Sequence, residues 1–163
     1  MTLIRNGLVV LVVGFSATFS ALTSAKEEYR LSAFSDVMGY AQIKSKDIAA
    51  VKEFMSVRNQ KKLDFLELNN LCVLGVLVED FSAAIRNCQV AIEKSGKSRD
   101  IGFSSKRKAL ASVHSNLAVA KALSGDVEGA QYELQMALSL NSRDTNVKSN
   151  IEWLESSNLV ARL

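Results

Sequence analysis

Apolar residues recur along this chain at the three- to five-residue intervals typical of helices that bury one face. Before Asp80 the apolar stripe comprises Leu63, Leu66, Leu71, Leu74 and Leu77, and after it Phe81, Ala84, Ile85, Cys88, Ala91 and Ile92. The same arrangement surrounds Asp126, with Ala109, Val113, Leu117, Ala120 and Leu123 before it and Val127, Ala130, Leu134, Ala137, Leu138 and Leu140 after it. The pattern predicts pairs of amphipathic helices joined by short turns, an all-α fold.

A short phrase marks each predicted turn. Asp47-Ile48-Ala49-Ala50-Val51, Asp80-Phe81-Ser82-Ala83-Ala84 and Asp126-Val127-Glu128-Gly129-Ala130 share Asp, an apolar residue, any residue, a small residue and then Ala or Val. An Asp at this place caps a helix by accepting bonds from its free N–H groups. Gly125 suits the positive φ that ends the preceding helix. Proline, which breaks helices, is absent from the chain.

The spacing of the three phrases predicts a short α-solenoid. Asp47 and Asp80 are 33 residues apart, close to the period of about 34 residues of one helix-turn-helix repeat class. Asp80 and Asp126 are 46 apart, so we expect an insertion in the polar stretch 94–102. The helical domain is expected over 26–157, with hairpins at about 32–57, 63–94 and 104–140, a polar-faced capping helix at about 143–156 and a loose tail at 158–163. In the weaker first unit, Phe34, Val37, Met38 and Ala41 form the apolar stripe before Asp47.

Units two and three resemble tetratricopeptide repeats. The resemblance rests on Asn116-Leu117-Ala118 with Ser124-Gly125-Asp126, Ala130, Leu134 and Ala137-Leu138, and less fully on Asn70-Leu71-Cys72 with Asp80-Phe81, Ala84 and Ala91-Ile92. It covers roughly 32–157 and is strongest from about 66 onward. The large aromatic usual early in each first helix is replaced by Ser35, Leu68 and His114, and Ser142 stands where a closing proline is common.

The resemblance implies a non-enzymatic protein–protein interaction scaffold that binds a peptide or helix in a concave groove. Carried over from the family, the groove residues are Tyr40, Ile43, Leu66, Asn69, Val73, Val76, Leu77, Ser112, Ser115, Val119 and Leu123. This set is largely apolar, and the family's basic clamp for peptide carboxylates is not reproduced. The alternatives are that these residues pack against the N-terminal segment, the capping helix or a second copy in a structural homo-oligomer. An enzyme with an unrecognised site is a further alternative.

The first residues have the order of a secretory signal peptide. Arg5 precedes the apolar core Gly7–Phe15, and Thr23-Ser24-Ala25 supplies small residues before the expected cleavage after Ala25. Cleavage would remove Arg5, the only charged side chain in 1–25, and lower the net charge from +3 to +2. We expect an exported protein, periplasmic in a bacterial cell envelope or secreted, without stable membrane insertion after cleavage. An uncleaved membrane anchor is the alternative, although the apolar run is shorter than the roughly 20 residues that span a bilayer.

The two cysteines lie at equal distances from the second turn. Cys72 is eight residues before Asp80 and Cys88 eight residues after it, so an antiparallel hairpin folded there brings them side by side. A disulfide requires Cα atoms within about 7 Å, and the small residues Gly75 and Ala84 favour such a close approach. We expect a disulfide, which export would allow to persist. Two buried free thiols and a redox-active pair are the alternatives.

Other chemistry finds little support. His114 is the only histidine and has no acid at ligand spacing, which favours packing over a metal or catalytic role. Phosphate-binding, dinucleotide-binding, hydrolase and zinc-protease motifs are absent from the sequence. The run Lys106-Arg107-Lys108 indicates a solvated helix face rather than a nucleic-acid site. We therefore expect no cofactor, no metal and no nucleic-acid partner.

Overall fold

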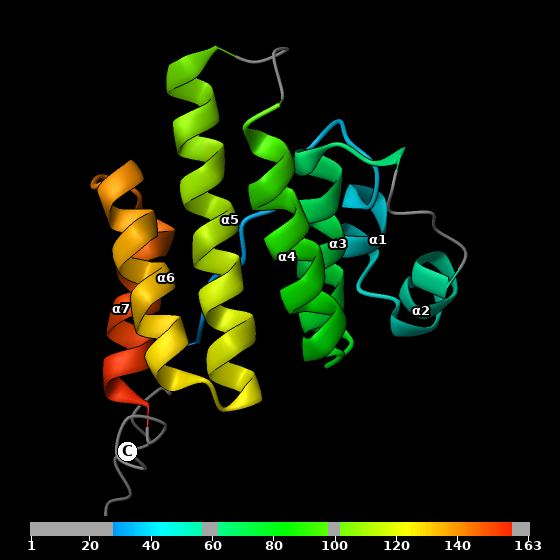
Figure 1. Ribbon diagram of the computed structural model, residues 1–163. Helices are drawn as coiled ribbons and strands as arrows, with labels where there is room; N and C mark the ends of the chain where they lie inside the picture. The colour runs from blue at the N-terminus through cyan, green and yellow to red at the C-terminus, as the bar shows by residue number, and fades with distance from the viewer. Residues whose placement is uncertain (1–27, 57–61, 98–101, 158–163) are drawn as a thin grey trace, which may run out of the picture.

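Helices form the regular secondary structure of residues 28–56, 62–97 and 102–157, the parts of the chain that the computed structural model describes, and no strand occurs in them. The seven helices are α1 (Tyr40–Ser45), α2 (Ile48–Ser56), α3 (Phe65–Leu77), α4 (Phe81–Ser95), α5 (Phe103–Ser124), α6 (Val127–Leu140) and α7 (Thr145–Ser156). The predicted all-α class is confirmed. Helices α3 and α4 lie over the range expected for the second hairpin, α5 and α6 over the third, and α7 over the expected capping helix (Figure 1).

The three Asp residues cap helices as predicted. The Asp80 carboxylate accepts from the N–H of Ala83 at the start of α4, and Asp126 accepts from Gly129 in α6. Asp47 accepts from two N–H groups in the first turn of α2. Each bond satisfies a donor that the helix itself leaves free. Gly125 has the predicted positive φ, 97°, and ends α5.

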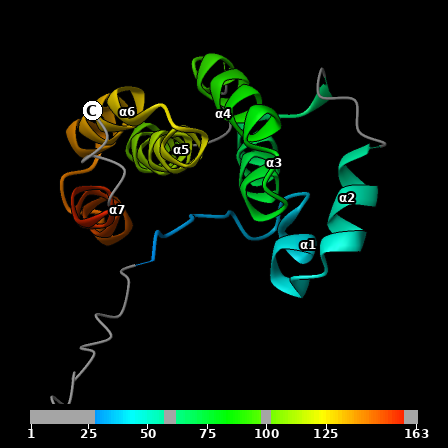
Figure 2. The same ribbon diagram turned by 90° about the horizontal axis from the view of Figure 1, so that it is seen from below.

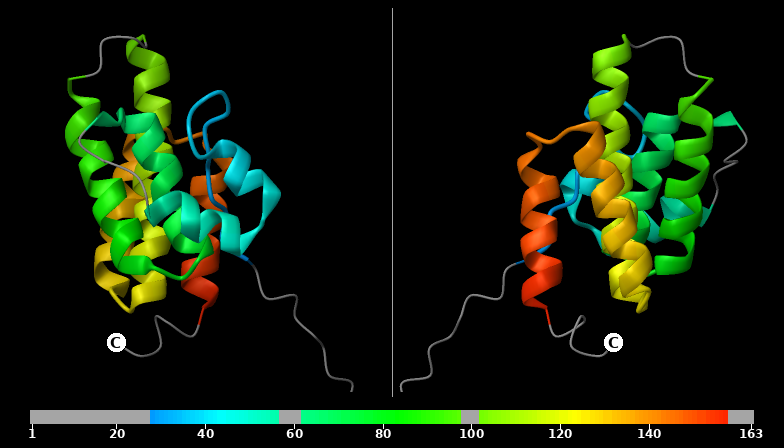
Figure 3. Two further views of the ribbon diagram at one scale, coloured as in Figure 1. Left: turned by 90° about the vertical axis from the view of Figure 1, so that its right-hand side faces the viewer. Right: turned by 60° about the vertical axis from the view of Figure 1, so that its left-hand side comes forward.

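The helices pack in consecutive pairs with a common core. α3 lies against α4, α4 against α5, and α5 against α6, while α7 packs on both α5 and α6. Gly75 permits the closest approach: a Cβ added there would lie 2.8 Å from the backbone nitrogen of Ala84. The core between the pairs includes Leu68, Cys72, Ala84, Cys88, Val113, Leu117, Ala130 and Leu134. Helices α1 and α2 cover the outer side of α3 around a smaller cluster of Val51, Leu71 and Leu74 (Figure 3).

The first unit differs from the prediction. A helical stripe through Phe34, Val37 and Met38 is wrong, because residues 28–34 are extended and 35–39 form turns, so α1 begins only at Tyr40. The reason is tertiary: the backbone N–H and carbonyl of Phe34 are bonded to the side chain of Asn70 rather than within a helix. Gly39, with φ 91°, then turns the chain into α1.

Several expectations concern residues that are not described. The signal peptide at 1–25 and the tail at 158–163 lie outside the described residues, as does part of the predicted insertion, 98–101. Within the described ranges, none of the helices combines the length and apolar character needed to cross a bilayer.

Candidate functional site

Residues 28–34, here called the extended segment, cross the face of the molecule lined by α7, α5 and α3. Figure 2 shows this part of the chain passing beside α7 and α5 and reaching α3 before it enters α1. The segment therefore crosses the helices in the reverse of their order along the chain. It lies where the resemblance placed a ligand groove.

Asparagine side chains hold the backbone of the extended segment. The N–H of Arg30 donates to Oδ1 of Asn150 (2.6 Å), and Nδ2 of Asn150 donates to the carbonyl of Arg30 (2.8 Å). In the same way, the N–H of Ser32 donates to Oδ1 of Asn116 (2.9 Å), whose Nδ2 donates to the Ser32 carbonyl (2.7 Å). Each carboxamide thus replaces a neighbouring β-strand for one residue.

A third pair completes the series at α3. The N–H of Phe34 donates to Oδ1 of Asn70 and its carbonyl accepts from Nδ2, both at 2.9 Å. Nδ2 of Asn70 also donates to the carbonyl of Met38 (3.1 Å). Residues 30, 32 and 34 alternate because, in an extended chain, every second residue presents its backbone groups to the same side. We call Asn70, Asn116 and Asn150 the asparagine ladder.

The ladder residues occupy repeated positions in the sequence. Asn70 and Asn116 each precede a capping Asp, Asp80 and Asp126, by ten residues, and Asn150 follows Asn116 by 34. Sequence reasoning used the first two only as marks of the repeat and missed their role. The available signal was this recurrence of an amide side chain at one register of three successive helices.

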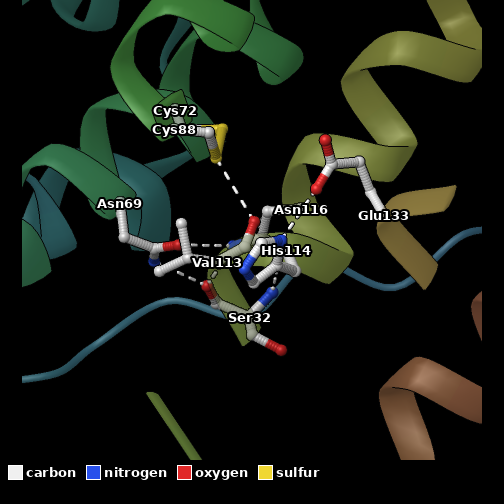
Figure 4. Close-up of a disulfide and its surroundings, with 8 residues drawn as sticks. All are labelled: Ser32, Asn69, Cys72, Cys88, Val113, His114, Asn116 and Glu133. Carbon is white, nitrogen blue, oxygen red and sulfur yellow. Dashed lines mark hydrogen bonds and ion pairs between the residues drawn. A yellow bond between two sulfur atoms is a disulfide. The ribbon is translucent and has the colours of Figure 1, made fainter. Parts of the chain in front are cut away.

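Further hydrogen bonds fix the ladder side chains. Nδ2 of Asn116 also donates to Oδ1 of Asn69 (2.8 Å), and Nδ2 of Asn69 donates to the Ser32 carbonyl (2.9 Å) (Figure 4). Nδ2 of Asn150 donates to Oγ of Ser115 (2.8 Å). The four asparagines are fully buried. Without the extended segment they would lose partners, at about 1–3 kcal/mol for each buried group left unsatisfied.

Side chains of the segment pack on both sides of the ladder. Tyr29 meets the Trp153 ring of α7 edge to face, with centroids 5.3 Å apart. Leu31 and Ala33 line an apolar cavity of 320 Å³ together with Ile43, Val73 and Leu77, all three from the predicted groove set. Apolar packing therefore adds side-chain selectivity to backbone recognition.

The remaining predicted groove residues have varied surroundings. Asn69 and Ser115 belong to the hydrogen-bond network of the ladder, and Val76 and Val119 are buried in the core. Those that stay half-buried are Tyr40, Leu66, Ser112 and Leu123. Of the alternatives open at the sequence level, packing against the N-terminal part of the chain describes this face.

His114 has a partner that its local sequence did not reveal. Its Nδ1 lies 2.7 Å from Oε2 of Glu133, whose Oε1 accepts from Nζ of Lys121 at 2.7 Å. Burial raises the pKa of Glu133, but the hydrogen bonds from His114 and Lys121 outweigh it, so that the pKa lies below its ordinary value. The histidine thus packs as expected, but the expectation that it lacks an acidic neighbour is wrong: α6 supplies Glu133, nineteen residues further on. No group of His, Cys, Asp and Glu suited to a metal ion occurs in the described residues.

The cysteines lie at disulfide distance inside the second hairpin. Their Cα atoms are 5.3 Å apart, and the structure joins Cys72 of α3 to Cys88 of α4. Both residues are fully buried, and Sγ of Cys88 faces the carbonyl of Val113 in α5 (Figure 4). A bridge around the 15 residues between them contributes on the order of 3 kcal/mol. It stiffens α3, which carries Asn69 and Asn70.

Comparison of this chain with known protein families, with characterised proteins and with solved structures yields no match in any of the three.

Proposed function

We propose that this protein is a non-enzymatic binding scaffold, a short tetratricopeptide-like α-solenoid that holds an extended polypeptide segment on the face of α3, α5 and α7. The observation that carries the proposal is the asparagine ladder, which pairs with both backbone groups of Arg30, Ser32 and Phe34. A carboxamide that pairs with backbone groups recognises an extended conformation and tolerates many side chains. Selectivity then comes from the ring of Trp153 and the cavity beside Leu31.

A partner segment would enter by exchange with the extended segment. Four fully buried asparagines line this face, and an emptied face would leave their carboxamides without partners at a cost that disfavours the vacant state. Residues 28–34 thus act as a resident ligand, tethered to α1 by a short turn. Because a tethered ligand has an effective concentration in the millimolar range, a free peptide competes well only when the tethered segment is weakened.

We also propose that the protein works after export to an oxidising compartment, the periplasm or the exterior. The order of charged, apolar and small residues in 1–25 and the closeness of Cys72 and Cys88 support this location. Exchange of the extended segment between two copies would make the homo-oligomer, the alternative use of the same face.

Binding of a labelled peptide that copies residues 28–38 tests the proposal. Tyr29→Ala weakens the resident segment at Trp153 and leaves the ladder intact, so the variant should bind the peptide about tenfold more tightly than the full wild-type chain. Adding Asn116→Asp to this variant replaces the donating amide by a carboxylate and should cost at least about tenfold in affinity. Fluorescence anisotropy gives the dissociation constants.

Tyr132→Ala is the matched control, because Tyr132 is 60% exposed on α6 and far along the chain from the segment. It should bind like wild type. If Tyr29→Ala gains no affinity, or if Asn116→Asp loses none, the ladder is only a structural brace and the proposal fails.

A further inference from the structure

A second cavity lies between α2, α4 and the end of α3, with a volume of 450 Å³. Its described lining differs throughout from that of the cavity beside Leu31. The inference below concerns this cavity and does not rest on the proposed function.

Asn87, on α4, lines this cavity with a buried and unsatisfied side chain. The residue is 1% exposed, and its Nδ2 and Oδ1 are both buried with no hydrogen-bond partner within the structure. The other fully buried asparagines of the described chain, Asn69, Asn70, Asn116 and Asn150, all donate hydrogen bonds through Nδ2. Burying an unpaired amide opposes folding, so a position that keeps one indicates a ligand with complementary groups.

The rest of the lining defines the chemistry of that ligand. Lys52 and Arg86 are exposed cations at the cavity, while Met55, Leu71 and Val78 supply apolar surface. Asp80 also lines it, but its carboxylate is engaged with the Ala83 N–H as the cap of α4. The cavity therefore combines one donor–acceptor pair, an apolar wall and two positive charges.

We propose that this cavity binds the C-terminal residue of a peptide. Its backbone N–H would donate to Oδ1 of Asn87 and a carboxylate oxygen would accept from Nδ2, the same two-bond pairing that Asn70 makes with Phe34. The other carboxylate oxygen would face Lys52 and Arg86. An apolar side chain would rest on the wall of Met55, Leu71 and Val78. A free C-terminus supplies all of these groups together.

N-acetyl-leucine is the smallest probe with this chemistry, and N-acetyl-leucinamide is its matched partner without the charge. Titration of the ¹⁵N-labelled full chain should shift the amide signals of Ala83, Arg86 and the Asn87 side chain. The uncharged probe, and the variant Arg86→Gln with the charged probe, should each bind about threefold more weakly, as expected for loss of an exposed charge. Asn87→Leu should weaken binding at least about tenfold, whereas Gln89→Leu, on the exposed side of α4, should not.

A thermal melt without the probe separates a binding role from a structural one. If the amide of Asn87 is unpaired, Asn87→Leu keeps or raises the melting temperature, because it removes an unsatisfied buried group. A fall of several degrees, or failure to fold, would show that the fold itself satisfies this amide and would overturn the proposal. The absence of shifts at about 10 mM probe, a concentration that detects millimolar affinity, would overturn it as well, and so would equal binding by Asn87→Leu.

Discussion

At the scale of single residues, Glu133 couples two helices through one carboxylate. It accepts from Lys121 and pairs with His114, both on α5, while it belongs to α6 itself. The carboxylate is 7% exposed, so its charge is stabilised by these two partners rather than by water. Breaking a buried pair by removing one member leaves the other uncompensated.

Glu133→Gln should destabilise the fold at neutral pH by about 1–3 kcal/mol. The pKa of Glu133 in the fold lies below its ordinary value of 4.5. The group therefore contributes stability that is fully present above that value and is lost as pH falls through the lower folded pKa. The difference between wild type and variant should be largest at pH 6–7 and shrink at about pH 3. Urea unfolding at the two pH values measures it.

Glu128→Gln serves as the control, because Glu128 is exposed on the same helix. It should change stability little at either pH. A Glu133→Gln deficit that is the same at pH 3 as at pH 7 would show that the side chain acts by packing and not by charge.

At the scale of helices, the contact of α3 with α4 is set by one missing side chain. Gly75 packs on the backbone of Ala84, with an added Cβ only 2.8 Å from its nitrogen and 2.9 Å from its Cα. The neighbour is backbone and cannot rotate away, so a methyl group there must push the helices apart. The same approach holds Cys72 and Cys88 within reach of each other.

Gly75→Ala should therefore cost about 1–3 kcal/mol despite the better helix propensity of alanine. Gly96→Ala is the matched control, because a Cβ there would meet only the Glu93 carbonyl oxygen, at 3.9 Å. We expect it to be neutral or slightly stabilising. Thermal melts of both variants decide the point, and a Gly75→Ala protein as stable as wild type would contradict the close packing of α3 on α4.

At the scale of the whole molecule, the extended segment ties the two ends of the described chain together. Its ladder partners are 36, 84 and 120 residues away. It bonds to three helices that otherwise meet only through their neighbours' packing, and it adds Tyr29, Leu31 and Phe34 to the margin of the core. The segment is thus both a brace for the helix array and the occupant of its binding face.

Hydrogen exchange should reveal the segment by an alternating pattern. The amides of Arg30, Ser32 and Phe34 donate to the ladder and should exchange slowly, while those of Leu31 and Ala33, which face the other way in an extended chain, should exchange faster. Asn116→Asp should abolish the slow exchange at Ser32, whereas Gln89→Glu on exposed α4 should leave the pattern unchanged. Uniform fast exchange across 30–34 in wild type would show that the segment does not stay on the ladder.

Short-range features of the sequence sufficed for much of the helical framework. Apolar periodicity marked α3 to α6, and Asp47, Asp80 and Asp126 marked helix starts, because capping acts within three residues. Equal spacing about Asp80 likewise paired Cys72 with Cys88. The tertiary structure alone decided what covers the face of α3, α5 and α7, since bonds between asparagine side chains and a distant backbone leave no periodic trace in residues 28–34. It also decided the partner of His114, because a contact between two helices depends on how they pack and not on the residues beside it in the chain.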